Sequence, residues 1–479
     1  MKKLLNYKII LGLQIFLTVI LMFFIIRLGV LPTPYIIGIS VLLLLLVVGM
    51  YFLMKPVHGE EVKRNVIGKV ISILLSIVMI VGCFPLYKGQ STIRGITGSN
   101  TQTVRFSLIV LKDSGIDDVA TLKEVSVNDS HDKKEHFTLA NNELHKQNNK
   151  IKINYLNSFS QLADDLYSGK CEAIFVNEAY NGMFEEKYPT FSSDTKVIWS
   201  FDITEEIESI SKNVNVTEEA FNIYVSGIDT RGPVSTVSRS DVNMIVTVNT
   251  KTKQILLTSI PRDYYVILDN KGKKDKLTHS GLGGINNTVK TVENFMGIDI
   301  NYYARVNFTS LIKIVDALGG ITVNSPVAFK TLHGNYQIVK GDNHLDGEMA
   351  LGFVRERYGL SGGDNDRIKN QQRVLSAMLE KAISPSIITN YSSVLDSIKD
   401  SLETNFTTDE LTSLIQMQIN DMTKWEILQV QMSGHGKMMT GGAYMPNHKL
   451  YYSIPDEESI KKCSDLIKRM IKGEIISVK

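Results

Sequence analysis

Two carboxylates and three arginines lie at the ends of apolar runs in the middle of this 479-residue chain. Asp229 ends one run, and Asp241 begins the next, with Arg231, Arg239 and Arg262 nearby in the sequence. Apolar runs predict strands, and charges at their ends predict that both carboxylates meet at one sheet edge. Carboxylates bind divalent cations and guanidinium groups bind phosphates, so this stretch predicts a seat for a cation and phosphate groups.

A second polar group follows about a hundred residues later. Arg355 and Arg357 are two positions apart, so an extended segment would point both side chains the same way. Asp364, Arg367 and Gln371 open a long stretch with apolar helical periodicity. The two arginines also fit a solvated face or structural ion pairs, so their spacing alone does not establish a phosphate site.

Lys276 and His279 lie between these two groups. We interpret Lys273, Lys274 and Lys276 as a solvated turn, with Lys276 a marginal phosphate contact. His279 is expected to brace the site rather than to act in catalysis.

The elements that must position these residues alternate between strands and helices. Together they predict an α/β fold in which helices flank a mixed sheet. The predicted strands are 221–231, 244–248, 255–262, 302–308 and 321–325. The predicted helices are 284–296, 310–318 with Thr309 as its cap, 345–354, and a long one that begins near Asp364.

Three apolar runs precede this region, at 9–26, 35–53 and 66–86. Each approaches the roughly 20 residues that span a bilayer, so we predict three transmembrane helices. Lysines and arginines flank the first run and the second connection, which places the N-terminus in the cytoplasm and the residues after Lys88 outside. A cleaved signal peptide would explain only the first run.

Composition narrows the classes of function. The 52 basic and 50 acidic residues give no broad electropositive footprint of the kind that nucleic-acid binding requires. The three cysteines, Cys83, Cys171 and Cys463, are too far apart to indicate a metal motif or a disulfide framework. Anion binding must therefore be local.

The chain divides into five predicted parts. They are a membrane anchor (1–88), a polar linker (89–103), an extracellular α/β accessory domain (104–212), a main domain (220–382) and a C-terminal extension that packs on it (383–479). In the accessory domain we expect strands at 105–112 and 171–177, a helix at 159–167 and a surface excursion at 128–150. In the extension we expect helices at 393–402, 408–419 and 457–471 and a strand at 425–432.

Nine short blocks, taken together and in order, resemble the LytR-CpsA-Psr family over residues 220–382. They begin at Gly227, Arg239, Ser259, Leu277, Val306, Asp316, Leu345, Val354 and Asp364, and the last ends at Gln372. The three spans and the accessory domain resemble the capsule-associated CpsA branch in particular. No single block would suffice for this identification.

The resemblance implies a phosphotransferase at the outer face of a Gram-positive membrane. Its substrates would be a polyprenyl-pyrophosphate-linked polysaccharide and peptidoglycan, and other capsule-assembly proteins are further candidate partners. It implies that Asp229 and Asp241 hold Mg²⁺, with Mn²⁺ as an alternative. The phosphate ligands would be Arg239, Arg262, Arg355, Arg357, Arg367 and Gln371.

A sugar hydroxyl that attacks phosphorus benefits from a general base. Asp364 is our candidate for that base, and Arg262 and Asp364 are the predicted catalytic pair. Asp366 competes with Asp364, because Asn365 and Asp366 stand where the family commonly has an aromatic residue or glycine. The apolar strands and helix 310–318 would wall a cavity for the lipid tail, although a filled core fits the same pattern.

Two other classes of function compete with the transferase. One is a non-catalytic scaffold of polysaccharide assembly that holds the lipid carrier. The other is a DNA-binding regulator, which the predicted topology disfavours because the cytoplasmic segments are too short for a DNA-binding domain.

Overall fold

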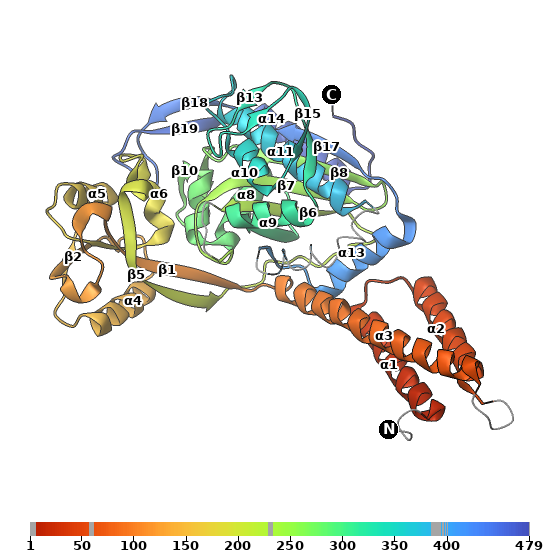
Figure 1. Ribbon diagram of the computed structural model, residues 1–479. Coiled ribbons are helices and arrows are strands. Elements are labelled where there is room, and N and C mark those ends of the chain that lie inside the picture. Colours follow the sequence, from red (N-terminus) through yellow and green to blue (C-terminus); the bar gives the residue numbers. More distant parts are fainter. Residues whose placement is uncertain are drawn as a thin grey trace.

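The computed structural model describes residues 6–56, 62–228, 233–384, 394, 397, 399 and 401–478. Three N-terminal helices, α1 (Tyr7–Leu28), α2 (Thr33–Met54) and α3 (Lys63–Ile96), are each long and apolar enough to cross a membrane. They project together from the rest of the molecule (Figure 1). The predicted linker at 89–103 is wrong for its first half: α3 continues to Ile96 because Thr92, Ile93 and Ile96 are buried against the body of the protein.

A five-stranded sheet follows, in the order β3-β2-β4-β1-β5. Its strands are β1 (Thr101–Leu111), β2 (Glu124–Val127), β3 (Lys152–Tyr155), β4 (Ile174–Asn177) and β5 (Thr195–Glu206). Its helices are α4 (Lys134–Gln147), α5 (Phe159–Tyr167), α6 (Asn181–Glu185) and α7 (Phe191–Asp194). The predicted surface excursion at 128–150 is wrong: Phe137, Ala140 and Leu144 bury one face of α4 in the core. Their spacing of three and four residues is the helical signal.

A six-stranded mixed sheet forms the main domain, in the order β16-β11-β6-β7-β8-β17. The strands are β6 (Phe221–Ile228), β7 (Ser240–Asn249), β8 (Gln254–Ile260), β11 (Tyr302–Asn307), β16 (Glu403–Thr404) and β17 (Glu426–Gln431). Strands β6, β7 and β8 are antiparallel neighbours, whereas β11 and β17 run parallel to β6 and β8. The segment 383–479 was predicted only to pack on this domain, but it supplies both edge strands.

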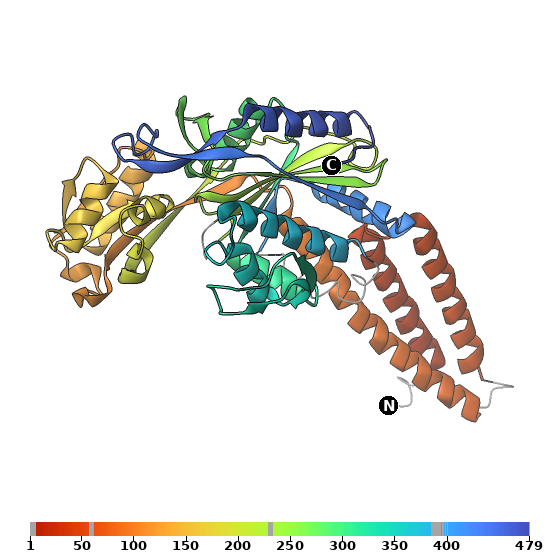
Figure 2. The ribbon, with the colours of Figure 1, turned by 90° about the horizontal axis from the view of Figure 1, so that it is seen from above.

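Helices cover both faces of this sheet (Figure 2). Tyr224 and Ile245 point to the face covered by α8 (Ile285–Met296) and α14 (Glu457–Ile471). Ile223 and Met244, one residue earlier in each strand, point to the opposite face and α11 (Asp364–Ala382). This alternation of apolar side chains lets one sheet bury both faces.

Smaller elements complete the fold. They are β9 (Tyr265–Leu268), β10 (Lys273–Lys276), the 3-10 helix η4 (Leu277–Gly283), α9 (Phe308–Ala317), β12 (Ile321–Ser325), β13 (Phe329–Lys330), β14 (Gln337–Ile338), β15 (Gly341–Leu345), α10 (Gly347–Arg355), α13 (Thr408–Asp421), β18 (Gly434–Met439) and β19 (Leu450–Pro455). The predicted solvated turn is half of a β9–β10 hairpin in which Lys276 is buried. Asn307, not Thr309, caps α9 through its side chain. Most of the predicted helix 393–402 lies outside the described residues.

Candidate functional site

Asp241 lies at a β-bulge between β6 and β7. Ile228 pairs with Ser240 and Gly227 pairs with Val242, so Asp241 is the extra residue on its strand. A Cβ added to Gly227 would lie 2.7 Å from the Cβ of Val242, so glycine permits this close approach. A bulge redirects a side chain at a strand end. Here it places the Asp241 carboxylate at the site, with 14% of the side chain exposed.

Arg262 reaches Asp241 from the neighbouring strand. The antiparallel register pairs Asn243 with Ile260, so the positions two residues beyond this pair are neighbours as well. The Nη1 of Arg262 donates to Asp241 Oδ2 at 2.8 Å, and the hydroxyl of Thr278 donates to Oδ1 at 2.9 Å. The backbone N–H of Thr278 also donates to the Arg262 carbonyl at 2.8 Å. The three residues form one hydrogen-bonded unit.

Two further arginines act on the same carboxylate. Burial alone would raise the pKa of Asp241, but Arg262, Arg239 and Arg367 together hold it well below its usual range. Burial and the nearby charge of Arg262 lower the pKa of Arg367, and Asp364 and Asp241 oppose that shift. Arg367 Nε is buried and has no hydrogen-bond partner among the described residues, so this donor remains available to a ligand.

The structure separates the two candidate bases. Asp364 Oδ1 lies 2.8 Å from Arg367 Nη2, inside the arginine cluster. Asp366 instead accepts from the N–H of Gly362 at 2.9 Å and lies 3.3 Å from Lys369 Nζ. Asp366 therefore stabilises the start of α11, where a negative charge is favoured. Of the two, Asp364 is the one that pairs with an arginine of the cluster.

The structure does not bring every predicted phosphate ligand into contact with this cluster. The guanidinium of Arg355 lies over the ring of Phe308 at 4.5 Å, and that of Arg357 lies over Tyr358 at 4.7 Å. Among the described residues, no ion pair links either arginine to Asp241. Gln371 is half-buried and lies one helical turn after Arg367, on the same face of α11.

Sequence analysis did not predict Asp263 or Tyr451 as ligands or catalysts, and it gave Lys276 only as a marginal phosphate contact. All three lie near the cluster. Asp263 lies 3.8 Å from Arg262 Nε and 3.7 Å from Lys276 Nζ. Burial, then the charges of Asp263 and Asp364, raise the pKa of Tyr451, which comes from β19. Asp263 directly follows the predicted ligand Arg262 and could have been suspected, but the hairpin that carries Tyr451 has no recognisable signal. Buried His279 pairs with Asp275 at 2.9 Å, and its role of bracing the site stays a prediction.

The predicted metal pair is only partly described. Asp229 lies outside the described residues, and the described part of the chain contains no group of three His, Cys, Asp or Glu side chains that could hold a metal ion. Asp241 is nevertheless a suitable ligand, because each of its oxygens accepts one hydrogen bond and keeps a further lone pair. One or two carboxylates together with substrate phosphates are a common donor set for Mg²⁺.

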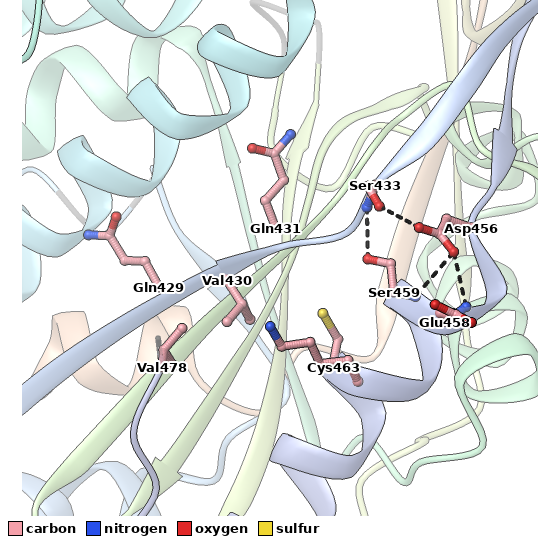
Figure 3. Close-up of a pocket in the computed structure, with 10 residues that line it drawn as sticks. Gln429, Val430, Gln431, Ser433, Asp456, Glu458, Ser459, Cys463 and Val478 are labelled. Atoms are coloured by element: carbon pink, nitrogen blue, oxygen red, sulfur yellow. Dashed lines mark hydrogen bonds between the residues drawn. The ribbon is translucent and has the colours of Figure 1, made fainter.

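A surface cavity of about 610 Å³ lies between β17 and α14 (Figure 3). Its polar residues largely bond to one another: Ser433 donates through Oγ to Asp456 and through its backbone N–H to Ser459, both at 2.9 Å. Asp241, Arg262 and Arg367 do not line it. The cavity wall does not include these three residues, but Gln431, which lines it, donates to Asn365, the neighbour of Asp364, at 3.2 Å.

About half of this chain is similar to known proteins. The chain is 37% identical over 233 residues to the polyisoprenyl-teichoic acid–peptidoglycan teichoic acid transferase TagU of Bacillus cereus, covering 48% of this chain and 73% of that protein. It is 34% identical to the protein of the same name from Enterococcus faecalis, covering 52% and 84%. The crystal structure of Bacillus subtilis TagU aligns with a TM-score of 0.43 at 30% identity, over 54% of this chain and all of that one.

Two family models match the sequence. The DNA polymerase processivity factor model matches residues 64–176, which begin inside the membrane helix α3, and this match covers too little of the chain to assign a family. The LytR_cpsA_psr family model matches residues 185–465, more than half of the chain, and these matches do not distinguish the capsule-associated branch. The chain therefore belongs to the LytR-CpsA-Psr family.

Proposed function

We propose that this protein transfers a capsular or related polysaccharide from a polyprenyl-pyrophosphate carrier to peptidoglycan at the outer face of the membrane. The observation that carries the proposal is the convergence of Arg239, Arg262 and Arg367 on one carboxylate, Asp241, whose side chain is 14% exposed. Such a concentration of guanidinium groups suits an anion whose charge must be neutralised and positioned. The names of the relatives add teichoic acid transfer to peptidoglycan as their activity.

The proposed reaction is phosphoryl transfer. A hydroxyl of peptidoglycan attacks the phosphorus next to the glycan, and the P–O bond to the polyprenyl phosphate breaks. The proton of that hydroxyl passes to the Asp364 carboxylate, and polyprenyl monophosphate leaves. Arg262 and Arg367 stabilise the charge that develops on the phosphoryl oxygens.

Mg²⁺ is the proposed cofactor, with Mn²⁺ as the alternative. Asp241 would hold it, together with Asp229, and when bound it would offset the negative charge of the pyrophosphate. Arg262 Nη1 donates to Asp241 at 2.8 Å and keeps this carboxylate ionised and oriented, with or without a bound cation.

The carrier's prenyl chain requires an apolar wall near the membrane. Half-buried apolar side chains lie on the α11 side of the main sheet and on α13, including Val225, Leu375 and Leu414. Helix α13 also contacts the membrane helix α3, since the hydroxyls of Thr97 and Thr408 lie 2.8 Å apart. This arrangement supports the entry of the prenyl chain from the membrane side.

Transfer by the full chain in lipid nanodiscs tests the proposal. The donor would be a polyprenyl-pyrophosphate oligosaccharide labelled in its sugar, the acceptor isolated peptidoglycan, and the reactions run with Mg²⁺ or with EDTA. Arg262→Ala is expected to lower the transfer rate at least about 100-fold. Arg105→Ala is the matched control, because Arg105 pairs with Asp202 at 2.6 Å and not with a carboxylate of the cluster. Donor binding without transfer under all conditions would favour the scaffold function instead.

A further inference from the structure

The accessory domain reaches the charged cluster through α6. Glu185, the last residue of α6, has Oε2 3.4 Å from Arg239 Nη2. Glu186, which follows it, has Oε1 2.6 Å from Lys276 Nζ. The side chains of Arg239 and Lys276 are 16% and 7% exposed, so α6 covers both cations. Figure 1 shows α6 on the side of the accessory domain that faces β10, which carries Lys276.

Backbone packing supports the same contact. A Cβ added to Gly182 in α6 would lie 2.0 Å from Arg239 Cζ, so the guanidinium lies directly on the glycine backbone. The Arg239 guanidinium thus packs on the backbone of Gly182 and pairs with the carboxylate of Glu185. Both come from the accessory domain, although Arg239 itself acts on Asp241 in the main domain.

The two glutamates change the formal charge of the site. Its described cations are Arg239, Arg262, Arg367 and Lys276, and its described carboxylates from the main domain are Asp241, Asp263 and Asp364. These seven groups carry a formal charge of +1, which becomes −1 with Glu185 and Glu186. The bridging pyrophosphate of the proposed donor carries two negative charges at neutral pH, so it must compete with these glutamates for the same cations.

The glutamates are suited to such an exchange. Their side chains are 33% and 26% exposed, so each carboxylate can return to water when its cation binds another anion. Displacing a carboxylate that already touches water costs less than displacing one that is fully buried. A phosphate with several oxygens can replace a single carboxylate on a guanidinium group.

We propose that Glu185 and Glu186 are specificity-determining residues that act as an internal anion competitor: they occupy Arg239 and Lys276 and set the affinity of the site for the donor's phosphates. The inference rests on the proposed function, because it takes the cluster to be the donor's phosphate site. An anion that binds weakly does not displace these carboxylates, whereas a donor that makes additional contacts does. The accessory domain thereby increases the affinity that an anion needs in order to occupy the site.

Calorimetric titration of the full chain in nanodiscs with inorganic pyrophosphate tests this inference. The double variant Glu185→Gln with Glu186→Gln keeps the side-chain size and removes two charges. It is expected to bind pyrophosphate about tenfold more tightly at low salt, and the difference should shrink at 1 M NaCl. The control is Glu143→Gln with Asp117→Asn, which removes two charges from pairs elsewhere in the accessory domain and should bind within about twofold of the parent protein.

The outcomes separate the two proposals. Equal or weaker pyrophosphate binding by the Glu185/Glu186 variant, with binding by the parent protein intact, would overturn the competitor and leave the donor site standing. Absence of binding by every form would overturn both the competitor and the phosphate site. Equal tightening in the control variant would also contradict the competitor, because the effect would then reflect only the total charge of the domain.

Discussion

Arg262 interacts with several charged groups of the cluster. It donates to Asp241, lies 3.8 Å from Asp263, and its charge depresses the pKa of Arg367. Arg262, Asp241 and Asp364 could be proposed from the sequence because charged residues follow apolar strands or begin an amphipathic helix. Arg355 and Arg357 show the limit of this reasoning. Helix α10 continues to Arg355, so a spacing of two no longer gives the two side chains a common direction.

The separation of Asp364 from Asp366 gives a prediction at the residue scale. Asp364→Asn should slow transfer by about 100-fold or more, because the acceptor proton loses its base, while donor binding is retained. Asp366→Asn should leave the rate within about threefold and lower stability by about 0.5–1 kcal/mol, because Asp366 holds the start of α11. Transfer rates and thermal unfolding of both variants measure the two effects. If Asp366→Asn lost more of the transfer rate than Asp364→Asn, Asp366 and not Asp364 would be the base.

At the scale of elements, the site depends on contacts that have no local sequence signal. Glu185 lies 54 positions before Arg239, and Glu186 lies 90 positions before Lys276. The bulge at Asp241 and the β18–β19 hairpin likewise depend on tertiary packing. In contrast, α5 and α14 have the predicted bounds, 159–167 and 457–471, because their apolar spacing is helical and buried on one face.

Gly182→Ala tests the seat that α6 provides. The added methyl group would meet the guanidinium of Arg239, whose flexible side chain can move away at little cost to the fold. We expect pyrophosphate affinity to fall by about threefold to tenfold, because Arg239 leaves its place beside Asp241, with little change in unfolding temperature. Ala179→Gly is the control, because it changes the segment next to Gly182 without adding an atom. Gly169→Ala is unsuitable, because the φ of Gly169 is +72° and alanine would be strained there. An unchanged affinity would contradict the contact.

At the scale of the whole molecule, the membrane anchor is seated on the main domain. Leu411 and Ile415 of α13 pack against Leu28 and Val30, at the end of α1, and against Ile93 of α3. The three apolar spans could be predicted from hydropathy. Their seat on α13 could not, because half-buried apolar residues on a short helix fit many partners.

The double variant Leu411→Ala with Ile415→Ala tests whether the contact between α13 and the membrane helices matters for transfer. Transfer from a membrane-embedded polyprenyl donor should fall about threefold to tenfold, because the site is no longer held in register with the bilayer. Transfer from a short-chain, water-soluble donor should be unaffected. Leu139→Ala, at an exposed position of α4, is the control. An equal loss with both donors would mean that the variant damages the site itself.

Asp132 gives a pH-dependent prediction for the accessory domain. Burial raises its pKa to about 7, while a hydrogen bond from Asn177 at 2.8 Å opposes the shift. The folded state therefore holds a proton that the unfolded state loses near pH 4, so this group lowers stability as pH rises from about 4 to 7. Asp132→Asn removes the effect and should stabilise the protein by about 4 kcal/mol at pH 8 but not at pH 4. Thermal unfolding at the two pH values measures it, and equal gains at both would contradict the assignment.

Following the two phosphates of the donor tests phosphoryl transfer directly. The phosphate next to the glycan would carry ³²P, and the full chain in nanodiscs would receive peptidoglycan as the acceptor. Because the arginines converge on a site for phosphate, we expect the labelled phosphate to enter the wall as a phosphodiester and unlabelled polyprenyl monophosphate to be released. Glycan joined to peptidoglycan without the label, with release of polyprenyl pyrophosphate, would show cleavage at the sugar carbon and contradict phosphoryl transfer.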